Sequence, residues 1–432
     1  MNPPTELGAR SLFDGMPQSV LTPGGGDFIS VLPDVLLHNV LGFLDAREAV
    51  RTCVIAKRWG HLWKSMPVLR ITGAGQVQLH RKFLDHLLLL RDCTNLEVCL
   101  FEFDHYDAAD VAYVNLWIRH ALLCQVRVLS LSVFGGGGGM VKEMWLDNLP
   151  VVSQYLTKLK LCGLRLGGKF LDFSSCQALQ DLNMTECRIY ADKISSQSLE
   201  YLSIQDCMFC SDCRTLISAP SVMSLQVNDC WGRTPLFQDM PVLVRATVTL
   251  DISCHDYCES NDPGYCDDAS CLACYPTDDG STGCVLLKGL SAARNLELIA
   301  EPEAFILKRD LRCCPTFSKL RTLLLSEWCV AGDHRALICI LQHSPVLEVL
   351  TLQLSELQNM KPRNMVPSKA IFNLLDQPFP PENLQRIKVK CHEVDQRVHN
   401  ILKSMIAYGV PLEKMSIQQE NKSSECKLLF HS

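Results

Sequence analysis

The sequence predicts an α/β solenoid, in which short strands stack into an arc behind an N-terminal block of three helices. Three observations lead to this fold class. Residues 28–67 carry apolar stripes at helical spacing, residues 68–380 carry short apolar clusters of one recurring form, and residues 381–420 read strand–helix–strand. Because helices repeat every 3.6 residues and strands every two, the change of period after residue 67 separates the two architectures.

Composition narrows the class of protein. The chain has 432 residues, of which 47% are apolar and 20% charged, so most of it should fold into one extended architecture or two to three domains. The net charge of −6 argues against a nucleic-acid partner. We see neither a window able to span a bilayer nor a secretory leader, and therefore expect no membrane partner and a location in the nucleus and/or cytoplasm. Residues 1–27, with four prolines, and residues 421–432 are expected to be disordered tails.

The helical block has recognisable start signals. Pro33 and Asp34 suit the first turn of a helix, and Asp45 and Glu48 have the spacing of a capping box that opens a second one. A block of this size buries little surface alone, so leftover apolar stripes indicate a partner site. The apolar positions are Leu32, Leu36, Leu37, Val40, Leu41, Phe43, Leu44, Val50, Cys53, Val54, Trp59, Leu62, Trp63 and Met66.

The block resembles an F-box, the helical module by which substrate receptors dock on the Skp-type adaptor of cullin-based ubiquitin ligases. The resemblance rests on the Leu32-Pro33 opening, the leucines of the first helix, Phe43-Leu44, and the run from Val50 to Trp63 in the form typical of plant F-box proteins with leucine-rich repeats. It implies adaptor contacts from Leu32, Pro33, Leu36, Leu37, Leu41, Val54, Trp59 and Trp63. The alternative is a three-helix core that packs on its own protein.

The strand clusters have the form apolar-x-x-apolar-x-apolar. Successive clusters that start at 156, 179, 199 and 222 lie 23, 20 and 23 residues apart, within the range of leucine-rich repeats, and later spacings of 27 and 37 make the repeats degenerate. Cys187, Cys207 and Cys230 follow three clusters at the position where this repeat expects Asn or Cys. The clusters are Val126/Leu129/Leu131, Leu156/Leu159/Leu161, Leu179/Leu182/Met184, Leu199/Leu202/Ile204, Val222/Leu225/Val227, Leu320/Leu323/Leu325, Leu347/Leu350/Leu352 and Leu384/Ile387/Val389.

Residues 251–284 interrupt the repeats with an acidic, cysteine-rich insert. Eight acidic residues and no Lys or Arg occur there, and Cys271-x-x-Cys274 has zinc-hairpin spacing, with Cys254 and Cys258 as a second pair. We weigh a structural zinc site against a disordered loop that projects from the arc, and favour the loop, so no metal or other cofactor is assigned. The loop would lie between strands near 242–250 and 285–287 and be dispensable for the fold.

The C-terminal pattern predicts a strand at 384–389, a helix that ends at Gly409 and Pro411, and a closing strand at 412–417. It resembles the FBD-type tail of plant F-box proteins with leucine-rich repeats, although the usual Gly-rich link before the helix is missing. Such an end would cap the solenoid.

The sequence offers little sign of catalysis. We find no nucleophile elbow, zinc-protease motif or phosphate loop. The resemblance implies the substrate-recognition subunit of a Skp–cullin–F-box ubiquitin ligase, with an adaptor, a cullin bound through it, and an unidentified target protein as partners. Two other classes remain open. One is a repeat scaffold without a ligase role, and the other is a zinc-dependent ubiquitin ligase that acts through Cys254–Cys284.

Overall fold

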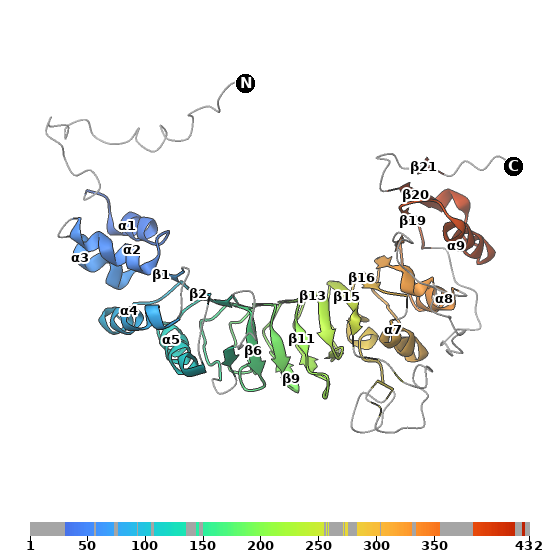
Figure 1. The fold of residues 1–432 in the computed structure, drawn as a ribbon. Helices are drawn as coiled ribbons and strands as arrows, with labels where there is room; N and C mark the ends of the chain where they lie inside the picture. Colours follow the sequence, from blue (N-terminus) through green and yellow to red (C-terminus); the bar gives the residue numbers. More distant parts are fainter. Residues whose placement is uncertain are drawn as a thin grey trace, which may run out of the picture.

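The chain forms an arc with a helical block at its N-terminal end (Figure 1). The computed structural model describes residues 31–55, 58–72, 77–92, 94–104, 108–134, 144–146, 150–254, 256, 258, 271, 273–274, 283–302, 304–330, 334–354, 383–419 and 426–427. The expected tails lie outside this part of the chain, except for residues 426–427. None of the helices within these ranges is long and apolar enough to cross a membrane.

The helical segments expected in residues 28–67 are present. The first helix begins directly after Pro33, and the carboxylate of Asp45 caps the second by accepting a hydrogen bond from the Arg47 amide at 2.8 Å. The elements are α1 (Asp34–Leu41), α2 (Ala46–Arg51), η1 (Thr52–Val54), α3 (Trp59–Leu62) and η2 (Trp63–Ser65).

One long parallel ladder runs the length of the arc. Neighbouring strands pair in register: Val68 lies opposite Val98, Val98 opposite Val128, and Val128 opposite Lys158. The strands, in spatial order, are β1 (Val68–Ile71), β2 (Val98–Phe103), β3 (Val128–Val133), β5 (Lys158–Cys162), β7 (Asp181–Thr185), β10 (Tyr201–Gln205), β13 (Ser224–Gly232), β15 (Arg245–Cys254), β16 (Asn295–Ala300), β17 (Thr322–Leu325), β18 (Val349–Gln353), β19 (Arg386–Cys391) and β20 (Met415–Gln419). The short β21 (Cys426–Lys427) pairs antiparallel with β20.

The return segments explain the uneven repeat length. Both ends of the arc return through helices on the convex side, whereas the middle returns through further short strands (Figure 1). A helix takes up more residues than a bend between strands, so the central repeats are the short ones. The helical returns are α4 (Val77–Leu90), η3 (Ala108–Asp110), α5 (Val111–Leu123), α6 (Leu287–Leu290), α7 (Phe305–Asp310), η4 (Leu311–Cys313), η5 (Glu327–Cys329) and α8 (Arg335–Gln342).

The central strands build two further parallel ladders. One joins β4 (Met144–Leu146), β6 (Leu164–Gly167), β8 (Arg188–Tyr190), β11 (Met208–Phe209) and the end of β13. The other joins β9 (Lys193–Ser195), β12 (Leu216–Ser218) and β14 (Leu236–Phe237). The described chain thus forms a large sheet of mainly parallel strands with helices, compatible with a leucine-rich-repeat solenoid.

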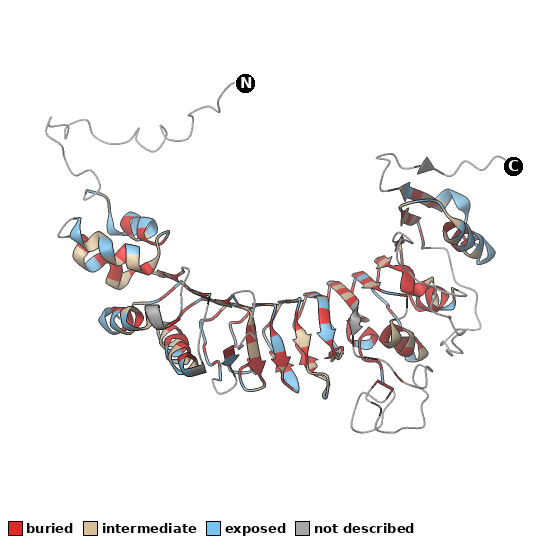
Figure 2. Ribbon diagram, viewed as in Figure 1, coloured by how far each residue is buried: buried red, intermediate tan, exposed pale blue. Residues whose placement is uncertain are grey.

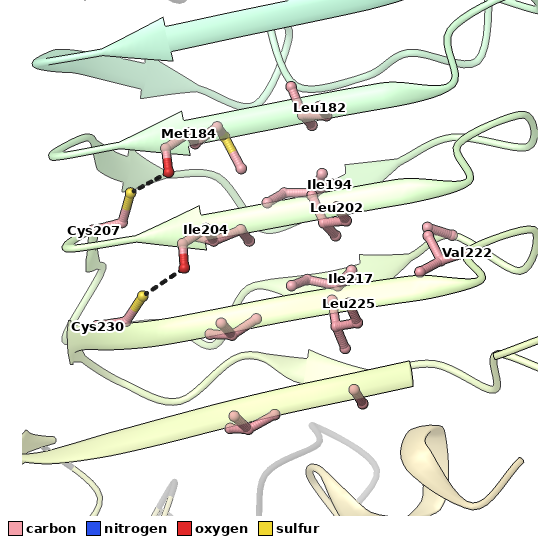
Figure 3. Close-up of a cluster of buried hydrophobic side chains, with 14 of the residues drawn as sticks. Leu182, Met184, Ile194, Leu202, Ile204, Cys207, Ile217, Val222, Leu225 and Cys230 are labelled. Atoms are coloured by element: carbon pink, nitrogen blue, oxygen red, sulfur yellow. Dashed lines mark hydrogen bonds between the residues drawn. The ribbon is translucent and has the colours of Figure 1, made fainter. Parts of the chain in front are cut away.

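The three ladder cysteines are buried between the first and second ladders. Cys207 donates its thiol hydrogen to the Met184 carbonyl at 3.5 Å, and Cys230 to the Ile204 carbonyl at 3.7 Å (Figure 3). Cys187 donates in the same way to the Leu161 carbonyl at 3.6 Å. The thiols therefore donate to carbonyls near the end of the neighbouring strand, which is the structural role expected for them.

The residue before each ladder cysteine adopts a left-handed backbone. Glu186, Asp206 and Asp229 have φ values of 52°, 50° and 53°. Gly163 holds the matching place one repeat earlier with φ 70°, and a Cβ there would lie 2.0 Å from the Val133 carbonyl oxygen. Only glycine fits at that position, because the neighbouring turn approaches too closely for a side chain.

Burial should make two of the ladder thiols, those of Cys207 and Cys230, unreactive in the folded protein. Burial raises the pKa of Cys230 to about 12 and that of Cys207 well above its ordinary value. Alkylation under native, reducing conditions should therefore label both at least about a hundredfold more slowly than Cys313, which is exposed. Peptide mapping by mass spectrometry measures the rates. Equal labelling of Cys207, Cys230 and Cys313 would contradict the repeat assignment.

The C-terminal region has the expected order of elements, except that residues 412–414 of the expected closing strand form a 3-10 helix and the strand begins at Met415. Strand β19 is followed by α9 (Gln396–Ala407), η6 (Leu412–Lys414) and β20. The Asp395 carboxylate caps α9 through the amides of Arg397 and Val398, and Gly409 ends the helix with φ 86°. Val398, Ile401, Leu402 and Met405 form its buried face.

The expected strand at 285–287 is wrong. Residues 285–286 are not in a strand, and the helix α6 begins at Leu287. The three backbone amides of Val285, Leu286 and Leu287 donate to the carboxylate of the buried Asp310, so they are satisfied by a side chain rather than by a ladder. Strand β15 accordingly pairs with β16.

Candidate functional site

Helix α1 has apolar side chains on two sides. Leu37 and Leu41 are fully buried, whereas Leu36, Val40 and Phe43 are 47%, 50% and 82% exposed. Positions 36, 40 and 43 are four and three residues apart, so they fall on one face of the helix and of the turn that ends it. We call Leu36, Val40 and Phe43 the α1 stripe. The mixture of exposed and buried residues on α1 is visible in Figure 2.

Further exposed apolar side chains lie close by in the sequence. Val35 is 70% exposed on α1, and Val31 is 78% exposed just before it. At the end of η1, Val54 is 85% and Ile55 64% exposed. Single exposed apolar residues are ordinary, but several within one small domain indicate a surface that another protein covers.

The structure divides the eight residues expected to contact an adaptor into two groups. Leu32 is half-buried, while Pro33, Leu36 and Val54 are exposed and available for contact. The side chains of the other four pack inside the chain's own core. This buried group is Leu37, Leu41, Trp59 and Trp63.

Most of the exposed apolar residues were not predicted from the sequence to contact an adaptor. Val31, Val35, Val40, Phe43 and Ile55 were not assigned that role. One signal was present: α1 has apolar residues at five of its eight positions, more than a single buried stripe requires.

Polar contacts fix α1 to the rest of the helical block and to the arc. The His38 ring nitrogen Nε2 lies 3.2 Å from both the Leu62 carbonyl and the Ser65 hydroxyl. Arg70 on β1 donates to the Gly42 carbonyl at 2.7 Å, and the Thr72 amide donates to Asp45 at 2.9 Å. The α1 stripe is therefore held in a set orientation relative to the first strand of the arc.

The apolar core continues from the helical block into the arc. Leu37, Trp59 and Met66 belong to the same cluster of buried side chains as the strand residues Leu69 and Ile71. The guanidinium of Arg47 on α2 also lies 5.2 Å from the centre of the Phe83 ring on α4. Shared burial makes the block and the arc one body rather than two domains on a flexible linker.

The solvent face of the main sheet presents rows of polar side chains. In-register pairing places Lys160, Asn183, Ser203, Gln226 and Thr247 in one row across five neighbouring strands. These positions alternate with the buried residues of each strand and are exposed or half-buried. Short polar side chains along a curved sheet offer hydrogen bonds to a protein surface without a deep pocket.

A cluster of partly exposed side chains stands on the β4–β6–β8 ladder. The Arg165 guanidinium lies 3.9 Å from the centre of the Trp145 ring and 4.2 Å from that of Tyr190. The two rings stack with centroids 5.7 Å apart. Arginine flanked by aromatic rings is the composition found at strong contact points of protein interfaces. The cluster was not predicted from the sequence, because its three residues are distant in the chain.

The acidic insert begins inside the fold. Asp251–Cys254 complete strand β15, and Asp256 is buried. The sulfurs of Cys258, Cys271 and Cys274 lie within 4.8 Å of one another. This corrects the expectation that the insert avoids burial, since Cys258 and Cys274 are buried as well.

Residues 29–71 match the F-box domain, and F-box domains generally bind Skp-type adaptors. The chain is 28% identical over 353 residues to a rice protein named MEIOTIC F-BOX protein MOF, covering 76% of this chain and 71% of that protein. It is 26% identical over 258 residues to an F-box/FBD/LRR-repeat protein of Arabidopsis thaliana, covering 52% and 60% of the two chains. An FBD-associated F-box protein of Arabidopsis thaliana is 26% identical over 357 residues, covering 76% and 75%.

The fold and the exposed stripe thus define a protein with an F-box at one end of a parallel-strand arc. More particularly, the chain has relatives among the plant F-box/FBD/LRR-repeat proteins at modest identity over much of its length. F-box proteins generally act as substrate receptors of Skp–cullin–F-box ubiquitin ligases, and such homologues are typically non-catalytic.

Proposed function

We propose that this chain is the substrate-recognition subunit of a Skp–cullin–F-box ubiquitin ligase, acting in the nucleus and/or cytoplasm. The observation that carries the proposal is the α1 stripe, an exposed apolar surface within residues that match the F-box domain. Its arc is a degenerate leucine-rich-repeat solenoid, closed by β19, α9 and β20 as an FBD-like cap. The cap covers the last strands, as the end of any solenoid requires.

The mechanism is positioning. An adaptor docked on the α1 stripe joins the chain to a cullin, and the arc holds a target protein at a fixed distance from that junction. Holding a target lysine near the charged ubiquitin-conjugating enzyme raises its effective concentration without a catalytic group in this chain. The shared core of the F-box and the arc supports this role, because a rigid connection holds the adaptor-binding and target-binding surfaces at a fixed separation.

The target binds, in this proposal, along the polar rows of the main sheet. The face is concave (Figure 1), so a convex protein surface can touch several strands at once. The row that contains Asn183, Ser203 and Gln226 lies at the middle of the arc. Hydrogen-bonding side chains there select a partner by its polar pattern, and such selectivity depends on matching donors and acceptors.

Reconstitution tests the proposal. The purified chain, mixed with a Skp-type adaptor and a cullin, should elute as one stoichiometric complex in size-exclusion chromatography, and a variant with the exposed Leu36, Val40 and Phe43 changed to alanine should elute alone. Failure of the intact chain to form the complex would favour a repeat scaffold without a ligase role. Ubiquitin-chain formation with the conjugating enzyme alone, lost on chelation, would favour the zinc-dependent ligase instead.

A further inference from the structure

Two segments of the acidic region meet in a buried cluster of thiols. The Cys258 side chain is 6% exposed, Cys274 is fully buried, and Cys271 is partly buried beside them. All three Sγ atoms lie within 4.8 Å of one another. Around a tetrahedral zinc ion with Zn–S bonds of about 2.3 Å, neighbouring sulfurs lie roughly 3.8 Å apart. A small inward movement brings the three thiols to that spacing.

The Cys271-x-x-Cys274 segment has the turn that a zinc hairpin requires. The Cys274 amide donates to the Cys271 carbonyl at 3.0 Å, so the chain reverses between the two cysteines. A turn of this kind brings two thiols two residues apart to the same side, which is the reason that the spacing recurs in structural zinc sites.

Buried arginines anchor both arms of the cluster to the arc. Arg309 on α7, itself 2% exposed, donates to the Cys274 carbonyl at 3.2 Å and to the Gly283 carbonyl at 2.9 Å. On the other arm, Arg214 donates to the buried Asp256 carboxylate at 2.6 Å, two residues before Cys258. The cluster therefore occupies a defined place at the base of the region.

The chemistry of the site favours zinc over other ions. Three thiols without a described carboxylate ligand suit a borderline-soft cation, whereas magnesium and calcium take oxygen ligands. Burial of Cys258 and Cys274 points to a structural ion, and the described residues supply three of the four ligands that a tetrahedral zinc takes. Three thiolates can hold a single ion. They are too few for a ubiquitin-ligase ring, which binds two ions and needs eight ordered ligands.

We propose that Cys258, Cys271 and Cys274 bind one structural zinc ion, which ties the acidic region to the convex side of the arc. Each ligand is a thiolate, so binding releases the thiol protons to solvent. The ion joins the arm that Asp256 anchors to the arm that Arg309 anchors. This proposal is independent of the ligase role, because it concerns the framework of the arc and not its partners.

Metal analysis of the full-length chain tests the site. Protein purified under reducing conditions with zinc in the medium should contain about one zinc per chain by mass spectrometry. Replacing Cys258→Ser, Cys271→Ser or Cys274→Ser should reduce the content toward zero. Cys53→Ser is the matched control, a partly buried cysteine in the F-box, and should leave the content unchanged.

A second measurement keeps the test decisive if the serine variants fail to fold. Wild-type protein stripped of metal and titrated with cobalt(II) should show the absorption of thiolate-bound tetrahedral cobalt, and zinc should protect these three cysteines from alkylation. Metal-free reduced protein that binds neither ion, a disulfide between two of the three cysteines, or undiminished zinc in the triple serine variant would each overturn the proposal.

Discussion

Truncation of the α1 stripe to alanine at Leu36, Val40 and Phe43 is expected to weaken binding of a Skp-type adaptor at least about a hundredfold. Full burial of such a side chain is worth about 1.5–3 kcal/mol. Leu36 and Val40 are about half exposed and Phe43 is 82% exposed, so docking removes that remaining area from water. The three side chains together contribute about 3–5 kcal/mol of binding free energy, and each 1.4 kcal/mol is a factor of ten in affinity.

The matched control changes exposed leucines elsewhere. Leu89 on α4 is 81% exposed and Leu123, the last residue of α5, is 82% exposed. Truncating both to alanine should leave the adaptor affinity within about twofold of the wild type. Calorimetric titration gives the affinities, and thermal unfolding shows whether each variant is folded. An unchanged affinity of the stripe variant, in folded protein, would rule out α1 as the docking surface.

The buried group of the F-box should behave differently. Leu37 and Trp59 face the core, and a large-to-small change in a core costs about 2–5 kcal/mol of folding free energy. Their truncation should therefore lower the melting temperature and the adaptor affinity together. This difference separates side chains that touch an adaptor from those that only support the surface.

The repeated strands could be predicted because their buried positions recur. Leu159 and Leu161 point inward on β5 with a period of two, and the next strands repeat that pattern at matched register. Strand β2 was not among the predicted clusters: its inward residues include Cys99 and Phe101, whereas the predicted clusters consist of Leu, Ile, Val and Met. Stacking depends on apolar volume at those positions and not on leucine itself.

Burial on α1 could not be predicted from its sequence. Apolar residues occupy most of its surface, and a pattern of that kind does not say which side faces the protein. Only the packing of α1 on α3 decides that Leu37 is buried and Leu36 exposed. Side chains distant in the sequence decide which face of the helix is buried, so the local hydrophobic periodicity does not reveal it.

The burial of residues in the acidic insert likewise could not be predicted from local sequence. Its acidic composition predicted a projecting loop, yet Asp256 is buried because Arg214 neutralises it from an earlier repeat. Burial alone would raise the pKa of Asp256, but the Arg214 guanidinium and the Thr234 amide hold that pKa below its ordinary value. The sequence showed Cys271 and Cys274 as a pair, but not that Cys258 joins them. In each case the deciding partner is a side chain that is not a neighbour in the sequence.

Loss of the Asp310 carboxylate is expected to be the most damaging single change at the end of the acidic region. Asp310 is fully buried, and its oxygens accept from the amides of Val285, Leu286 and Leu287 at 2.7–3.0 Å. Arg309 donates to the same carboxylate at 2.8 Å. These four donors take the place of the strand pairing that residues 285–287 lack.

Asp310→Ala should therefore lower the free energy of unfolding by about 3–5 kcal/mol, because it leaves a buried arginine uncompensated and three amides without their acceptor. Asp239→Ala provides the control, since Asp239 is exposed and only 3.9 Å from the equally exposed Lys288. That change should alter stability by about 0.5 kcal/mol or less. Urea unfolding followed by circular dichroism measures both. Equal stability of the two variants would show that the amides of residues 285–287 find other acceptors, and the anchoring role of Asp310 would then be wrong.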